Sequence, residues 1–77
     1  MIKEDMQFNY SKLRGRIVEV YGTICNFSKK MEMSPNRMGR LLKNDSEWNS
    51  TEIVKACKLL DIKMVDIKDY FFTIVEK

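Results

Sequence analysis

Signals that begin and end helices recur at short intervals along this chain, so each helix that it forms must be short. Gly22 is a typical helix stop. Residues of the kind that cap helix N-termini stand at Ser11, Thr23, Ser34 and Asn49. Apolar residues between these signals repeat with the helical period, whereas strict alternation never persists beyond about four residues. The sequence therefore predicts an all-α fold.

The apolar spacing predicts five helices. Pro35 directly after Ser34 marks the first turn of the third helix. Asn49 and Glu52, three residues apart, form a capping-box pattern at the start of the fourth. The β-branched residues of the tail, residues 72–75, favour an extended conformation. The expected helices span roughly residues 12–21, 24–31, 35–43, 50–60 and 64–71.

The 77 residues are enough for one small domain, because a chain this short buries only about 60% of the surface that its unfolded form exposes. We expect residues 8–77 to form that domain and the polar segment 1–7 to be a loose arm. The chain has no histidine, which removes the commonest general base and the imidazole ligands of most zinc sites. We therefore expect no enzyme activity, no metal site, no cofactor and no small-molecule ligand.

The cysteine count and the start of the chain indicate a cellular compartment. The chain has two cysteines, Cys25 and Cys57, whereas a small secreted chain usually carries more. This low number fits a reducing cytoplasm. No stretch approaches the roughly 18 apolar residues of a membrane span, and Glu4 and Asp5 stand where a signal peptide needs an apolar run. We expect a cytoplasmic protein with no membrane contact.

Positive charge is concentrated in the middle of the sequence. The whole chain has a formal net charge of +3, but residues 12–43 hold eight Lys and Arg against two Glu, a net charge of +6. Residues 44–77 carry five basic and seven acidic residues. A basic region inside a nearly neutral protein is typical of proteins that bind polyanions.

Two short helices joined by a tight turn, the second of them polar and basic, are the arrangement of a DNA-binding helix-turn-helix. At about 100° per residue, the polar side chains of the third helix fall within an arc of about 120°. The apolar residues Met38, Leu41 and Leu42 lie on the opposite side. A solvated charged face would give the same arc. The short spacing of the two helices, the lack of acidic residues between Met33 and Asn44, and the +6 charge favour DNA.

The side chains on this arc have the chemistry for reading DNA. Arg offers a bidentate fork to guanine, and Asn bonds bidentately to adenine. Arg40 occupies the middle of the arc. The expected base-contacting residues are Asn36, Arg37 and Arg40, and the expected phosphate-contacting residues are Lys30, Lys43 and Asn44.

Three segments carry a resemblance to a known family: FNYSKLRGRIVEVYG, WNSTEIVKACKLLDI and IKDYFF. From Phe8 to Phe72 the chain resembles the small phage and prophage repressors of the Cro/CI type, the helix-turn-helix group of the lambda and 434 repressors, and especially a small phage-associated subfamily. The resemblance implies a compact five-helix, lambda-repressor-like domain in the cytoplasm of a bacterium or phage-infected host. It also implies base contacts at Pro35, Asn36 and Arg40. Because Pro35 has no N–H to donate, Asn36 and Arg40 are the better candidates.

The sequence departs from the family pattern at three positions. Glu32 stands where a turn glycine is common, and a positive φ there costs about 1 kcal/mol relative to glycine. Ile24 replaces a polar residue that contacts phosphate. Gly39 lies inside the recognition helix, where glycine lowers helix stability by about 1 kcal/mol relative to alanine.

These features together predict a sequence-specific regulator that binds double-stranded DNA at an operator, as a repressor or Cro-like protein. An interaction module, such as an antirepressor or adaptor that turns its basic face toward an acidic protein, is the alternative. RNA binding is less favoured, because exposed aromatic residues are not interleaved with the basic ones.

One short helix reads few base pairs, so we expect two copies to act together as a homodimer. The surface expected for pairing lies at the C-terminal end, through either a tail strand or packed aromatic side chains. A small patch implies weak association. The two copies could therefore form a dimer in solution or pair only on the operator. The expected residues are Tyr70, Phe71, Phe72, Ile74 and Val75.

Overall fold

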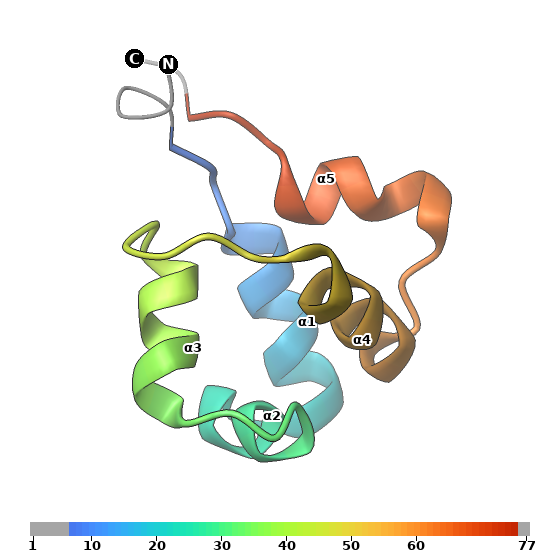
Figure 1. Cartoon of the computed structure of the whole chain (residues 1–77). Coiled ribbons are helices and arrows are strands. Elements are labelled where there is room, and N and C mark those ends of the chain that lie inside the picture. The colour runs from blue at the N-terminus through green and yellow to red at the C-terminus, as the bar shows by residue number, and fades with distance from the viewer. Residues whose placement is uncertain (1–6, 76–77) are drawn as a thin grey trace.

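The apolar stripes form short helices in the computed structural model, which describes residues 7–75 (Figure 1). A 3₁₀ helix, Met64–Asp66, directly precedes the last α-helix, so only part of the expected fifth helix is α-helical. Across residues 7–75, strand-like pairing is limited to one antiparallel bridge between Phe8 and Ile74. The prediction of an all-α, five-helix fold is confirmed. The α-helices are α1 (Ser11–Tyr21), α2 (Ile24–Lys30), α3 (Pro35–Leu42), α4 (Ser50–Leu60) and α5 (Ile67–Phe71).

Most of the predicted helix ends are confirmed. The side chains of Thr23, Ser34 and Asn49 each accept a hydrogen bond from the backbone N–H three residues further on. Glu52 completes the capping box at Asn49. Gly22 ends α1 with φ of 84°. Each of these bonds satisfies a backbone group that a helix end would leave unpaired.

The predicted N-cap at Ser11 is wrong. Ser11 is the first residue of α1, and Tyr10 holds the cap position without a side-chain capping bond. The N–H of Ser11 instead donates to Oδ1 of Asn9 at 2.9 Å. The side chain of Tyr10 is 6% exposed, so this position contributes to the core rather than to the helix cap.

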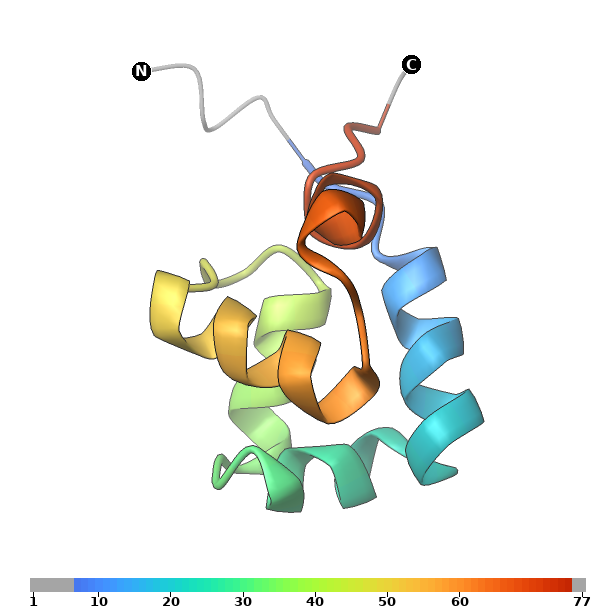
Figure 2. The same ribbon diagram turned by 90° about the vertical axis from the view of Figure 1, so that its right-hand side faces the viewer.

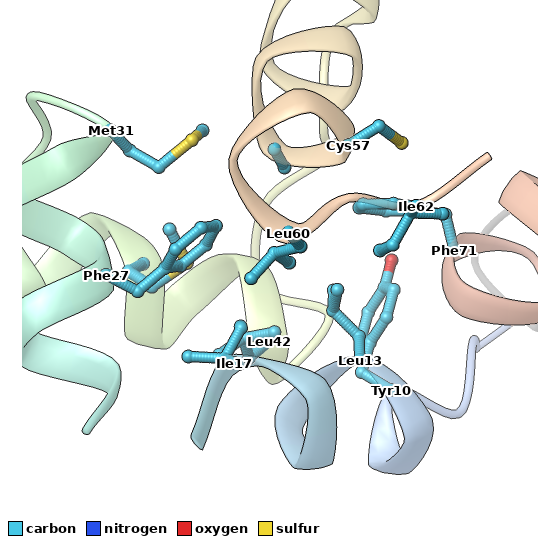
Figure 3. Close-up of a cluster of buried hydrophobic side chains, with 12 residues drawn as sticks. Tyr10, Leu13, Ile17, Phe27, Met31, Leu42, Cys57, Leu60, Ile62 and Phe71 are labelled. Atoms are coloured by element: carbon cyan, nitrogen blue, oxygen red, sulfur yellow. The ribbon is translucent and has the colours of Figure 1, made fainter. Parts of the chain in front are cut away.

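The core lies where the helices face one another, and Figure 3 shows side chains from all of them converging there. A fully buried Leu, Ile or Phe side chain contributes roughly 1.5–3 kcal/mol, so these contacts orient the helices. Ser28 is the buried polar residue among those described, and its hydroxyl donates to the Ile24 carbonyl at 2.9 Å. The core residues are Tyr10, Leu13, Ile17, Phe27, Met31, Met38, Leu42, Ala56, Cys57, Leu60, Ile62 and Phe71.

The turn between α2 and α3 keeps a left-handed residue although it has no glycine. Glu32 has φ of 62°. Its N–H donates to the Lys29 carbonyl, and the N–H of Met33 donates to the Ser28 carbonyl, both at 3.0 Å. This is a Schellman motif, in which glycine is the usual residue at the left-handed position. Asn44 and Asp61 hold the equivalent positions after α3 and α4, with φ of 67° and 55°.

The tail runs back along the segment that precedes α1. The N–H of Asn9 donates to the Thr73 carbonyl at 2.6 Å, and that of Val75 donates to the Gln7 carbonyl at 2.9 Å. The extended tail is therefore present at residues 73–75. Of the expected arm, residues 1–6 lie outside the described residues. Figures 1 and 2 both place α5 at the opposite end of the molecule from α2.

No helix formed by residues 7–75 has the length and apolarity that crossing a membrane requires.

Candidate nucleic-acid interface

The helix α3 separates an apolar inner face from a polar outer face. Its three apolar residues Met38, Leu41 and Leu42 are buried. The outer face presents Asn36 and Arg40, both exposed. The Ser34 cap and Pro35 set the start of the helix, so the Asn36 side chain lies in its first turn. A helix of this kind can enter a major groove with its N-terminal residues against the base edges.

The third expected base reader, Arg37, is tied to α4. Its Nε and Nη2 groups donate to both carboxylate oxygens of Glu52, at 2.9–3.2 Å. The Arg37 side chain is 38% exposed and that of Glu52 is 15% exposed. The same carboxylate accepts the backbone N–H of Asn49 in the capping box. Glu52 therefore has two roles, of which the sequence pattern identified only the cap.

A second set of contacts joins the α2–α3 turn to α4. The Lys55 ammonium donates to the Met31 carbonyl at 3.2 Å and lies 3.4 Å from Oε1 of Glu32. Together with the Arg37–Glu52 pair, this contact fixes the turn and the start of α3 against α4. A shallow cavity of about 380 Å³ lies between them, lined by Met31, Glu32, Met33, Ser34, Arg37, Thr51, Glu52 and Lys55.

The expected phosphate contacts lie in two different environments. Lys30 at the end of α2 and Lys43 after α3 are both exposed. Asn44 is half-buried, and its side chain already binds the backbone of Phe8. Oδ1 of Asn44 accepts the Phe8 N–H, and Nδ2 donates to the Phe8 carbonyl, each at 2.9 Å. The amide of Asn44 thus anchors the segment before α1, which leaves the second hydrogen of Nδ2 for the expected phosphate contact.

Part of the central positive charge lies away from α3. Nε of Arg16 donates to the Leu60 carbonyl at 2.8 Å, at the C-terminal end of α4. A cation suits this position because carbonyl groups are unpaired at a helix C-terminus. The ammonium of Lys12 lies 4.9 Å from the centre of the Tyr70 ring. The cationic face that α3 itself offers is thus smaller than the +6 of residues 12–43 indicates.

The residues expected for pairing are divided between core and surface. Phe71 is 1% exposed and packs edge-on against Trp48, with ring centres 5.0 Å apart. It is a core residue, so we correct its assignment to the pairing surface. Tyr70 is half-buried beneath Lys12. The exposed members are Phe72, Ile74 and Val75, at 44%, 52% and 39% exposure.

Burial raises the pKa of the Tyr10 phenol and of the Cys57 thiol above their ordinary values. Desolvation disfavours the charged form of each group. Both belong to the core and are not on the outer face of α3.

Comparison with known proteins gives a family and a structural relative. Residues 6–74 match the family described as "Protein of unknown function (DUF739)". No curated protein is significantly similar to the chain. The chain is similar to the solution structure of the modulator of repression (MOR) of the temperate bacteriophage TP901-1 from Lactococcus lactis. The two are 37% identical over 88% of this chain and 92% of that chain, with a TM-score of 0.78. The likeness associates this fold with phage regulation.

Proposed function

The chain belongs to the DUF739 family, and from the geometry of α3 we propose that it is a sequence-specific, non-catalytic regulator that binds double-stranded phage DNA in the bacterial cytoplasm. The observation that carries the proposal is the outer face of α3. Asn36, Arg40 and Lys43 are exposed there, while the apolar residues of the same helix are buried. In this proposal α3 enters the major groove, as in repressors of the Cro/CI type.

The exposed side chains take different roles in this proposal. Asn36 and Arg40 meet base edges, which specify the sequence. Lys30 and Lys43 meet phosphates, which position the protein on the duplex. The name of the structural relative, modulator of repression, supports a regulatory role in a phage.

Two copies act on one operator in this proposal. The exposed side chains of Phe72, Ile74 and Val75 lie beside the bridge between Phe8 and Ile74, at the other end of the molecule from α2. This arrangement allows two tails to meet while both α3 helices face the DNA. Two-fold symmetry then requires inverted half-sites, and we expect them about 10 base pairs apart, centre to centre, as for other helix-turn-helix dimers.

Selection from a pool of randomised duplexes tests the proposal. We expect the wild-type chain to enrich one short motif and the Arg40→Ala variant to lose that enrichment. Lys58→Ala is the matched control, because it removes the same charge from an exposed residue of α4. Enrichment of no motif by the wild-type chain, or an unchanged motif with Arg40→Ala, contradicts the proposal.

A second candidate function follows from the name of the relative. A modulator of repression can act on a repressor protein, in which case the basic face of α3 contacts an acidic protein surface. Co-elution of the chain with the repressor of its own phage, together with no binding to duplex DNA at low salt, would favour this candidate. Binding of enriched duplex without the repressor would favour the first.

A further inference from the structure

The ion pair between Arg37 and Glu52 uses only one edge of the guanidinium. A guanidinium is planar and has five N–H donors, arranged along edges that can each bind two acceptor atoms. The Nε and Nη2 edge faces the carboxylate of Glu52. The edge formed by Nη1 and the second hydrogen of Nη2 faces away from it. Arg37 thus binds Glu52 and still has a complete fork to offer.

The side chain of Arg37 is 38% exposed and starts from the helix whose outer face is proposed to meet DNA. Arg37 is the third residue of α3, one turn before Arg40 and next to the exposed Asn36. Residues at the start of a recognition helix contact base edges. The O6 and N7 acceptors of guanine match two parallel N–H donors of one arginine edge.

Glu52 is itself held in place, so it can act as a fixed support. It lies in the first turn of α4, is 15% exposed, and accepts the Asn49 N–H in the capping box. Its two oxygens accept every hydrogen bond of the pair. A flexible arginine restrained by a fixed carboxylate loses less conformational freedom when it binds its target.

The charge of Glu52 also bears on the balance between specific and non-specific binding. Non-specific affinity for DNA comes from cations that neutralise phosphates. A carboxylate at 2.9 Å offsets the charge of Arg37 without covering its outer edge. The arginine then contributes less to non-specific attraction and keeps its geometry for one base.

We propose that Glu52 is a specificity-determining positioning residue, which holds the Arg37 guanidinium so that its outer edge reads a guanine. This inference rests on the proposed DNA-binding function and deepens it, because it predicts one base of the operator and the pair of residues that reads it. Arg37 makes the contact, and Glu52 acts through Arg37.

The test uses duplexes enriched by the wild-type chain and variants of both residues. Glu52→Gln removes the charge and keeps the cap, because Gln also serves in a capping box. Glu32→Gln is the matched control: it removes a charge from the same cavity at a residue that binds Lys55 instead of Arg37. Arg37→Lys keeps the charge and loses the fork.

The readout is the ratio of affinities for the enriched duplex and for one in which a single guanine is replaced. We expect Arg37→Ala and Arg37→Lys to lower this ratio about tenfold at one position. Glu52→Gln should lower it about threefold at the same position and should strengthen binding to random DNA. Glu32→Gln should leave the ratio unchanged. In the Arg37→Ala background, Glu52→Gln should have no further effect on the ratio.

A merely structural ion pair would change stability and would leave the base preference intact. An unchanged ratio with Glu52→Gln, or an equal loss with Glu32→Gln, therefore overturns the inference and leaves the proposed function standing. Enriched sites with no guanine that depends on Arg37 overturn it in the same way. Failure of the wild-type chain to bind any duplex overturns the proposed function, and this inference with it.

Discussion

Replacing Glu32 with glycine should stabilise the protein. Glu32 has φ of 62° at the left-handed position of the α2–α3 turn, which costs a residue with a Cβ about 1 kcal/mol relative to glycine. The substitution also removes the ion pair with Lys55, whose atoms are 3.4 Å apart. The Glu32 side chain is 83% exposed, so this pair contributes only about 0.2–0.5 kcal/mol. The expected net gain in the free energy of unfolding is about 0.5–0.8 kcal/mol.

Urea denaturation followed by the fluorescence of Trp48, the single tryptophan, measures this gain. The indole packs against Phe71 in the core, so its emission should report unfolding. Glu32→Gln isolates the loss of the ion pair, because it keeps the Cβ. Asp61→Gly is the second control, and we expect it to gain less, since Asp tolerates a left-handed conformation better than Glu. If Glu32→Gly were less stable than Glu32→Gln, the argument from backbone strain would be refuted.

Three further predictions concern α3 and the core. Arg40→Ala should cost about 1–3 kcal/mol at an enriched duplex, whereas Lys43→Ala should weaken all sequences alike and lower the salt slope by about 1, both measured by gel shift. Asn44→Gly keeps the left-handed backbone but loses two hydrogen bonds to Phe8. Hydrogen exchange at the Phe8 amide should therefore accelerate, while DNA affinity should stay the same. A loss of DNA affinity would instead indicate a phosphate contact. Burial raises the pKa of the Cys57 thiol above its ordinary value of 9.0, so the thiol ionises at a lower pH in the unfolded chain than in the folded one. Stability in urea should therefore fall as the pH rises from about 8 to 10, and it should fall less in Cys57→Ala.

The helix ends could be predicted because their signals are local. The caps at Thr23, Ser34 and Asn49 each join a side chain to a backbone group three residues away, so a short stretch of sequence contains both partners. The buried side of α3 could be predicted for a similar reason: Met38 and Leu42 lie one turn apart. Ser11 failed as a cap because the Tyr10 side chain is buried, which local propensity does not show.

The contacts that shape the candidate site join residues distant in the sequence. Arg37 and Glu52 belong to different helices, and Asn44 binds Phe8, which lies before α1. The sequence shows that these side chains are polar but gives no indication of which polar group they meet. For the aromatic residues 70–72, the sequence likewise does not show which side chains face the core. Only the packing of α5 shows that Phe71 faces the core and Phe72 the solvent.

Titration of the isotope-labelled chain with an enriched duplex, followed through its backbone amide resonances, tests the central claim most directly. We predict that the changes concentrate on residues 34–43 and on Lys30, and that they weaken steeply with added salt, because phosphate contacts release counterions. The side-chain Nε resonance of Arg37 should shift with them. No change at low salt, or changes confined to residues 64–75, would contradict the claim that this chain binds DNA through α3.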